Sequence, residues 1–220
     1  MKLARELERR LERLVEGVSG AIFRGRVHPV DLGTRILREA DLNMTDGVAG
    51  PTVPNEFHIG LNPEDLEAAG APARLKSELE YTLYSTAADR GWRIEGPANV
   101  IISSDPSIKP KHLKILGQTA PGDLEPWGQL IGGGGRHTDI TQNRALIGRA
   151  ADCDITLSEP EVSRRHAIIH REQGRTWVTD LDSANGTTID GAVVSSTMPL
   201  RPGARLTIGP VSFMFRLVEQ

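Results

Sequence analysis

The sequence predicts two domains of different class: an α+β domain with the order ααβαββ over residues 1–118, and an all-β sandwich over residues 127–220. Before residue 118, apolar side chains recur at the three- and four-residue steps of amphipathic helices. Beyond residue 127 no helical period remains, and short strand-forming runs alternate with turns, which is typical of a β-sandwich. Residues 119–126, which contain Ala-Pro-Gly and Glu-Pro, are expected to form the linker.

The first domain is expected to hold three helices and three strands. The leucines and valines of the N-terminal segment fall on one side of a helix whose other side is Glu and Arg. Pro29 suits the first turn of the second helix, and Asn62 suits the cap of the third, which Gly70 and Pro72 could divide in two. The helices are expected at 1–23, 29–42 and 62–91, and the strands at 57–61, 92–102 and 112–116.

The second domain is expected to contain short strands joined by tight turns. Asp190-Gly191 is a strong signal for a two-residue hairpin, and Gly209-Pro210 suits a turn between the last two strands. The expected strands are 128–131, 145–148, 154–157, 167–171, 176–181, 187–189, 192–194, 205–208 and 211–218.

Composition and charge argue against several classes of partner and location. A net charge of −3 and only two tyrosines give no pull toward nucleic acid or an anionic membrane. No apolar run approaches the ~18–20 residues that span a bilayer, so no direct membrane insertion is expected. The single cysteine, Cys153, cannot form an internal disulfide and fits a reducing compartment, which predicts a cytoplasmic protein.

No pattern in the chain indicates an enzyme, a cofactor or a metal site. No Ser/His/Asp ordering, paired carboxylates or Cys/His set stands out. His166 and His170 would lie about 13 Å apart on a strand, too far for one ion. The glycines of 132–135 lack the Lys-Ser/Thr and the following helix of a nucleotide-binding loop, so a hairpin is expected there. An active site within residues 1–118 is the weaker alternative, which a ligand bound in that domain would support.

Three polar stretches lie in predicted loops of the sandwich, each between two strands. They are Gly148-Arg149, then Ser163 to His166, then Ser183 to Thr187. Because the loops of a sandwich cluster at its two ends, residues far apart in sequence can meet on one rim. Such a rim would hold arginines, hydroxyls and a side-chain amide, a donor set that suits an anion with several oxygens.

The order of these stretches resembles the successive motifs of the forkhead-associated (FHA) domain, over roughly residues 127–219. The matching motifs are Ile147-Gly148-Arg149, Cys153-Asp154-Ile155, Val162 to His166, Asp180 to Ser183, and Asn185-Gly186-Thr187. Each is weak alone, whereas the five in order are specific. The resemblance implies a module that binds phosphothreonine, with a preference over phosphoserine that arises from a pocket for the γ-methyl group.

The resemblance also implies roles for individual residues. Arg149, Ser163 and Arg164 would contact the phosphate, and Asn185 would hold the peptide backbone. Ala184 belongs to the same phosphopeptide-binding set but departs from the family pattern, because many relatives have a threonine or another polar side chain there. The residues expected to support the site are Gly148, His166, Gly186 and Thr187.

A second resemblance covers the N-terminal domain. Residues 1–33, Val53 to Ile59, and Asp89 to Trp92 look like the domain of unknown function that precedes FHA modules in some actinobacterial proteins. There the pair acts as a scaffold beside Ser/Thr kinases and the cell-envelope machinery. This chain departs from those relatives in its short linker.

Together these features predict a bacterial signalling adaptor that binds threonine-phosphorylated partners, such as a Ser/Thr kinase or a cell-envelope protein. The alternative is a scaffold whose degenerate FHA domain binds protein without phosphate. Binding that survives phosphatase treatment of the partner would favour that alternative.

Overall fold

The computed structural model describes residues 29–68 and 72–218, and these form two compact units. The first unit comprises residues up to Thr45 together with Thr52–Ala87 and Ile94–Gly122. The second comprises Asp46–Pro51, Ala88–Arg93 and Asp123–Gln220. The helix expected at 1–23 lies outside the described residues. Among those described, no helix is both long and apolar enough to cross a bilayer.

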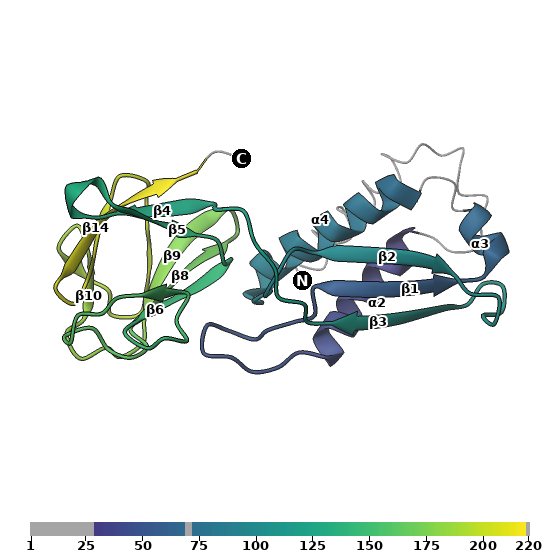
Figure 1. Cartoon of the computed structure of the whole chain (residues 1–220), viewed down its shortest axis with the longest axis horizontal. Helices are drawn as coiled ribbons and strands as arrows, with labels where there is room; N and C mark the ends of the chain where they lie inside the picture. The colour runs from purple at the N-terminus through teal and green to yellow at the C-terminus, as the bar shows by residue number, and fades with distance from the viewer. Residues whose placement is uncertain (1–28, 69–71, 219–220) are drawn as a thin grey trace. The chain divides into compact units, whose positions relative to one another are not determined.

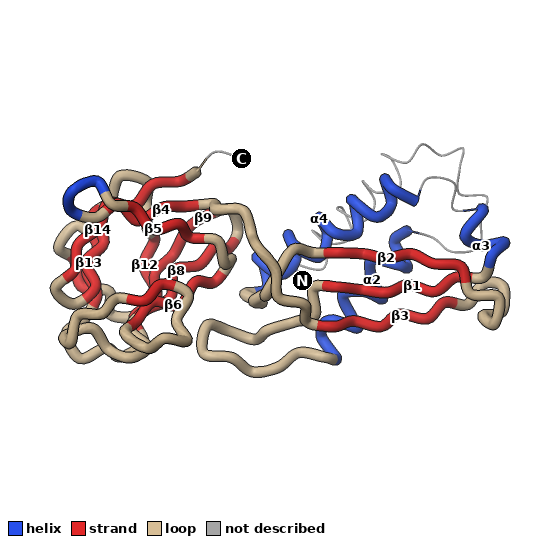
Figure 2. Tube along the Cα trace, viewed as in Figure 1, coloured by secondary structure: helices blue, strands red, loops and turns tan. Residues whose placement is uncertain are grey.

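A three-stranded mixed sheet forms the centre of the first unit. Its central strand is β1 (Glu56–Leu61), flanked by β2 (Asn99–Ser104) and β3 (Leu113–Gln118). Strand β2 runs parallel to β1 and β3 runs antiparallel to it, as the arrows in Figure 1 show, and the three strands lie side by side in Figure 2. The parallel pair requires a long crossover, which helices α3 (Pro63–Ala68) and α4 (Pro72–Arg90) provide.

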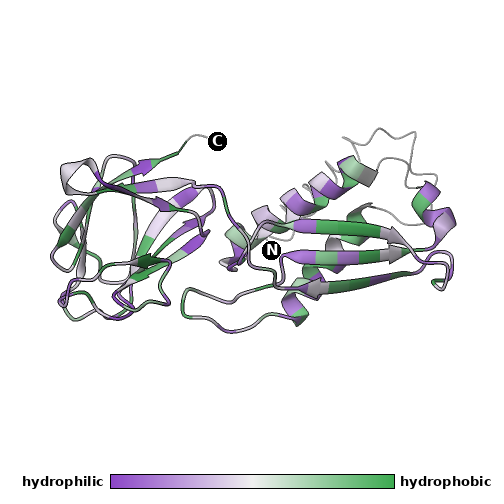
Figure 3. Cartoon of the chain, in the orientation of Figure 1, coloured by the Kyte–Doolittle hydropathy of each residue, from purple (hydrophilic) through white to green (hydrophobic). Residues whose placement is uncertain are grey.

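Helices cover one face of this sheet and build its core. Phe57, Ile59 and Leu61 point to the helical side and are fully buried, whereas His58 between them is exposed. Helix α2 (Pro29–Leu42) packs against β3. In Figure 3, apolar segments in green alternate with polar segments in purple along β1 and along α4. The buried helical side chains include Leu32, Ile36, Leu37, Leu75, Leu79 and Leu83.

The helix bounds follow from capping chemistry. Helix α2 begins at Pro29, as expected. Asn62 caps α3, because its Oδ1 accepts the backbone N–H of Glu64 at 3.0 Å. The expected third helix corresponds to α3, which ends at Ala68, and α4, which begins at Pro72, a residue suited to a first helical turn.

The strand expected at 92–102 was too long, since β2 begins only at Asn99. Pro97 has no N–H for the sheet. The backbone that precedes Pro97 forms hydrogen bonds with a loop instead, since the carbonyl of Glu95 accepts the N–H of Gly122 at 3.3 Å. The strand expected at 112–116 is present as β3, shifted toward its C-terminus.

The second unit is a sandwich of two sheets. One sheet has the order β11-β10-β13-β14-β4-β5 and the other β12-β9-β8-β6-β7. The strands are β4 (Gly128–Ile131), β5 (His137–Ile140), β6 (Arg144–Gly148), β7 (Ile155–Thr156), β8 (Ala167–Glu172), β9 (Arg175–Asp180), β10 (Thr187–Ile189), β11 (Ala192–Val193), β12 (Thr197–Pro199), β13 (Arg205–Ile208) and β14 (Val211–Leu217).

Apolar side chains from both sheets fill the space between them. Trp127 and Phe215 meet edge to face, with ring centroids 6.3 Å apart. Leu130, Ile147 and Val178 are fully buried in the same core. The α+β domain followed by an all-β sandwich confirms the predicted fold class.

Two strands of the sandwich, β5 and β12, were absent from the sequence-based expectation. The glycines at 132–135 form the turn between β4 and β5, which includes a short 3₁₀ segment (Gly133–Gly135). The predicted hairpin at Asp190-Gly191 is present, with both residues at positive φ (51° and 85°), as a type I′ turn requires.

His170 on β8 is a buried histidine with a partner at each ring nitrogen. It is only 4% exposed. The Arg144 guanidinium lies 3.3 Å from Nδ1, and Thr179 Oγ1 lies 3.3 Å from Nε2. Because arginine can only donate, Nδ1 is the acceptor and the proton resides on Nε2. Burial, followed by the charge of Arg144, lowers the pKa of His170 from 6.5 to about 4.

The stability of the second unit is therefore expected to fall as the pH drops from about 6.5 toward 4. The unfolded chain takes up the His170 proton first, so this contribution is fully present above pH 6.5 and is lost below it. Urea unfolding of the full chain at several pH values measures the slope. His170→Gln should flatten it, whereas His137→Gln, at an exposed position on β5, should not. Equal slopes for wild type and His170→Gln would contradict the assignment.

Candidate functional site

One end of the sandwich gathers the loops in which the sequence places its polar stretches. Strand β6 ends where β8 begins, since Ile147 pairs with Ala167. Ala167 in turn pairs with Asp180 at the end of β9. Thr187, which opens β10, pairs with Ile208 at the end of β13. The β6–β7, β7–β8, β9–β10 and β13–β14 connections therefore share one rim.

Arg149 follows β6 and is exposed on this rim. Its backbone N–H donates to the carbonyl of Ser163 at 2.9 Å, and its Nε donates to the carbonyl of Val162 at 3.2 Å. The Nε contact fixes the direction of the side chain. The two terminal nitrogens of the guanidinium have no hydrogen-bond partner among the described residues, so they can both donate to an anion.

Ser163 is oriented by the neighbouring loop. Its Oγ accepts the backbone N–H of Ala184 at 3.0 Å. Because this contact uses a lone pair of the oxygen, the hydroxyl proton is available to a ligand. The Ala184 N–H, in contrast, is already committed to Ser163.

His166 is a fully buried brace beneath the rim. Its Nδ1 accepts the N–H of Ser163 at 3.1 Å, and its Nε2 lies 3.0 Å from the carbonyl of Gly186. These partners assign the neutral tautomer with the proton on Nε2. Gly186 has φ +74°, in the left-handed region that glycine adopts without strain. The imidazole thus joins the Ser163 loop to the Gly186 loop.

Asp180 is the residue of this site that the sequence analysis left without a role. Its Oδ2 accepts the hydroxyls of Ser183, at 2.8 Å, and Thr187, and its Oδ1 accepts the backbone N–H of Ser183. Burial raises the pKa of Asp180, but the hydrogen bonds from Thr187 and Ser183 and the nearby His166 outweigh it, so the net pKa is lowered. The carboxylate holds the turn that carries Ala184 and Asn185.

Asp180→Asn is expected to lower both the stability of the domain and its affinity for ligand, although Asp180 is not among the residues predicted to contact the ligand. An amide has one acceptor oxygen in place of two, so at least one donor loses its partner, at about 1–3 kcal/mol. Denaturant unfolding and peptide titration of the same sample measure the two effects. The matched control is Asp182→Asn, at an exposed position in the same turn. If Asp180→Asn and Asp182→Asn behaved alike, the carboxylate would not hold the turn.

Asn185 and Arg164 complete the predicted set. Asn185 is exposed, and its Nδ2 donates to the carbonyl of Glu161 at 2.7 Å, which anchors the amide across the rim. Arg164 is exposed, and its side chain borders a hollow of about 560 Å³ together with Arg165 and Asp152, which form an ion pair at 2.9 Å.

The backbone of Arg164 is fixed beneath the surface. Its carbonyl accepts the N–H of Ala150 at 3.0 Å and lies 3.2 Å from Cys153 Sγ. Burial raises the pKa of the Cys153 thiol, which favours the protonated form that can donate to this carbonyl. The Cys153 thiol thus helps to hold the backbone of the loop at Arg164.

The structure brings all five predicted ligand-binding residues to one rim, with the four predicted supporting residues at or below it. The groups on this rim are two exposed guanidiniums, an exposed carboxamide and the half-buried hydroxyl of Ser163, contributed by three loops. Such a set can neutralise an anion and hydrogen-bond an extended peptide beside it. The role of each residue in binding stays a prediction.

Comparison with known families agrees with this geometry. Residues 4–116, just over half of the chain, match the model of the FhaA N-terminal domain. The chain belongs to the FhaA N-terminal domain family. In this FhaA-like chain, residues 145–209 match the FHA domain, and that range contains the whole rim described above. Neither match is to a catalytic domain.

Three of the curated proteins similar to the FhaA-like chain are mycobacterial. The FHA domain-containing protein FhaA of Mycobacterium tuberculosis is 33% identical over 89 residues, which are 40% of this chain and 17% of that protein. FhaB of the same organism is 32% identical over 82 residues, 37% of this chain and 53% of FhaB. The ABC transporter ATP-binding/permease protein Rv1747 is 33% identical over 134 residues, 60% of this chain and 15% of the transporter. The chain thus spans about half or less of these relatives.

Solved structures similar to the FhaA-like chain cover its FHA domain. The FhaA FHA domain in complex with the intracellular domain of Rv3910 is 32% identical, with a TM-score of 0.37, over 42% of this chain and 100% of that one. Mycobacterium tuberculosis EmbR in complex with a low-affinity phosphopeptide is 28% identical, with a TM-score of 0.41, over 44% of this chain and 26% of that one.

Proposed function

We propose that this chain is a cytoplasmic adaptor that binds threonine-phosphorylated proteins at the rim formed by Arg149, Ser163, Arg164, Ala184 and Asn185. The N-terminal domain would bring its own partner alongside the phosphorylated one. Bacterial Ser/Thr kinases, or cell-envelope proteins that they phosphorylate, are the partners that the FhaA-family relationship favours.

The observation that carries this proposal is that contacts within the chain orient both Arg149 and Ser163. The guanidinium is already oriented by its Nε contact, and the hydroxyl is already oriented by the N–H of Ala184. A phosphothreonine carries about −1.5 to −2 charges at neutral pH and three acceptor oxygens, which these donors match. Preorganised donors lose little conformational entropy on binding, so they favour affinity.

The test is a calorimetric titration of the full chain with a phosphothreonine peptide library and its unphosphorylated counterparts. Binding that requires the phosphate supports the proposal and yields the sequence preference around it. Because a phosphate–arginine contact is charge-assisted, the affinity should also fall as the salt concentration rises.

The competing function is a scaffold that binds protein without phosphate. Ala184 favours it, since this position offers the phosphate no polar side chain and its N–H is already donated to Ser163. A partner captured from cell extract separates the two functions. Capture that persists after phosphatase treatment of the partner would favour the scaffold and contradict the phosphothreonine reader.

A further inference from the structure

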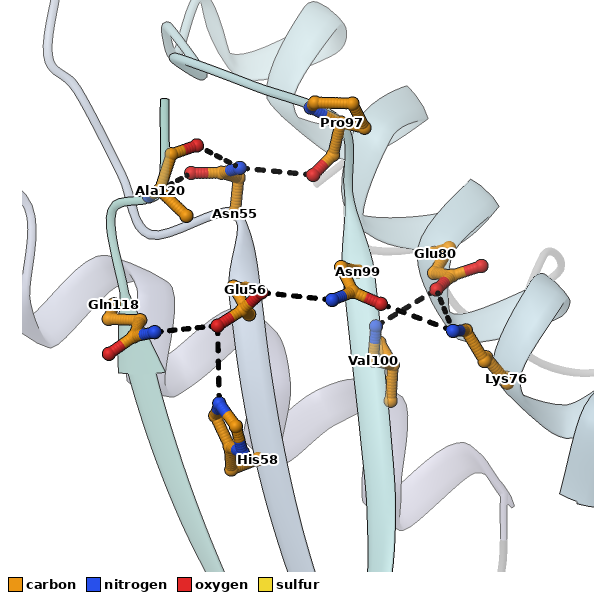
Figure 4. A network of polar contacts seen from close by, with 10 residues as sticks. All are labelled: Asn55, Glu56, His58, Lys76, Glu80, Pro97, Asn99, Val100, Gln118 and Ala120. Atoms are coloured by element: carbon orange, nitrogen blue, oxygen red, sulfur yellow. Dashed lines mark hydrogen bonds and ion pairs between the residues drawn. The ribbon is translucent and has the colours of Figure 1, made fainter. Parts of the chain in front are cut away.

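The two edge strands of the sheet in the first unit, β2 and β3, differ in the side-chain contacts made to their outer sides. At the β2 edge, the N–H of Val100 donates to the Glu80 carboxylate of α4 at 2.9 Å, as Figure 4 shows. Lys76 of the same helix donates to the side chain of Asn99 at 3.1 Å. Side chains of α4 therefore occupy the start of this edge, at Asn99 and Val100, and hinder another strand from pairing there.

The opposite edge, β3, carries no such cover among the described residues. Strand β3 pairs only with β1, so alternate N–H and C=O groups along its outer side have no strand partner. Within residues 29–68 and 72–218, no side chain bonds to the outer backbone groups of Leu113–Gln118 as Glu80 does to Val100. The side chain of Gln118, at the end of the strand, donates inward to Glu56 at 2.6 Å.

A groove of about 480 Å³ lies beside this edge, between β3 and α2. Its apolar lining is Leu113 and Ile115 of β3 and Leu42 of α2, which is 71% exposed. A large apolar side chain at the C-terminal end of a helix, next to an open strand edge, offers a pocket for alternate side chains of an added strand.

The charges of the groove favour an acidic occupant. Arg35 and Arg38 line it one helical turn apart, and neither forms an ion pair with a described residue. The carboxylate of Glu39, which also lines it, accepts a hydrogen bond from Asn43 at 3.0 Å. A second copy of the chain fits poorly, because antiparallel pairing of β3 with itself about a two-fold axis would bring the same arginines together.

We propose that the outer edge of β3 binds an extended segment of a partner protein, about six residues long, in which every second residue faces the groove and these groove-facing residues include both apolar and acidic ones. The segment adds a fourth strand to the sheet, places its apolar side chains against Leu42, Leu113 and Ile115, and its carboxylates beside Arg35 and Arg38. This surface is separate from the phosphothreonine rim and does not depend on it.

Amide exchange and chemical-shift mapping of the isotopically labelled full chain test this inference. Without peptide, alternate amides of β3 should exchange rapidly, because the outer edge has no partner. A short capped peptide with Val and Glu at its groove-facing positions and Thr at the positions between them should shift and protect the Leu113–Gln118 amides. Arg35→Glu with Arg38→Glu should weaken binding roughly tenfold or more, because the double reversal replaces attractive charge contacts by repulsive ones. Leu116→Lys, at an exposed position on the opposite face of β3, is the matched control.

Four results would overturn the proposal. Slow exchange along the whole of β3 in the peptide-free chain would mean that the edge is already covered. A concentration-dependent dimer with protected β3 amides would assign the edge to a second copy. Equal binding of the same peptide with Lys in place of Glu would mean that the arginines do not select an acidic segment. Shifts confined to the sandwich, or none at all, would show that the groove is not a binding surface.

Discussion

Replacing Arg149 by alanine is expected to lower the affinity for a phosphothreonine peptide by at least about 30-fold. The guanidinium supplies charge-assisted contacts in a rim where its direction is fixed by Val162, and losing such a contact costs about 2–5 kcal/mol. Because the side chain is exposed, the fold should be retained, and the thermal midpoint should hardly change. Calorimetric titration together with thermal unfolding measures both quantities.

A second variant at this position separates charge from geometry, and a variant at a distant arginine serves as the control. Arg149→Lys keeps the charge but cannot make two parallel hydrogen bonds, so it should recover only part of the affinity. Arg201→Ala removes an exposed arginine from the turn before β13, at the other end of the sandwich, and should bind like wild type. An Arg149→Ala protein that binds the phosphopeptide as tightly as the Arg201→Ala protein would exclude this arginine from the site.

Gly148→Ala is expected to damage both the fold and the rim. A Cβ at this position would meet the backbone of Arg164, with the carbonyl carbon at 2.8 Å, and Arg165 Cα at 3.0 Å. That backbone cannot retreat easily, since Arg164 O accepts the Ala150 N–H. Overpacking of this kind costs typically 1–3 kcal/mol, and the displaced loop carries Ser163 and Arg164.

Urea unfolding and peptide titration of Gly148→Ala should both show losses, with affinity reduced about tenfold or more. Gly133→Ala is the matched control, because a Cβ there meets nothing within 4 Å. A Gly148→Ala protein as stable and as active in binding as Gly133→Ala would mean that the loop accommodates the methyl group.

Much of the fold could be predicted because local chemistry determines it. Pro29 begins α2, Asn62 caps α3, and Asp190-Gly191 makes a tight turn, each through its own backbone preference. Strands β5 and β12 were missed because their residues show no apolar alternation. They are strands because neighbours pair with them, as Thr138 does with Leu130.

The candidate site was predictable in its residue types and their order, but not in its connections. The motif spacing located Arg149, Ser163 and Asn185. The role of Asp180 depends on Ser183 and Thr187 meeting one carboxylate, which only the folded turn shows. The commitment of the Ala184 N–H to Ser163 likewise joins residues 21 positions apart, and no local pattern encodes it.

The central claim is that the rim at one end of the sandwich binds phosphothreonine, and amide chemical-shift mapping of the full chain tests it most directly. Titration with the tightest phosphothreonine peptide from the library should shift the amides of Arg149, Ser163, Ala184 and Asn185, while the matching unphosphorylated peptide should leave them unchanged. Shifts that fall elsewhere, or that are the same with and without the phosphate, would contradict the claim.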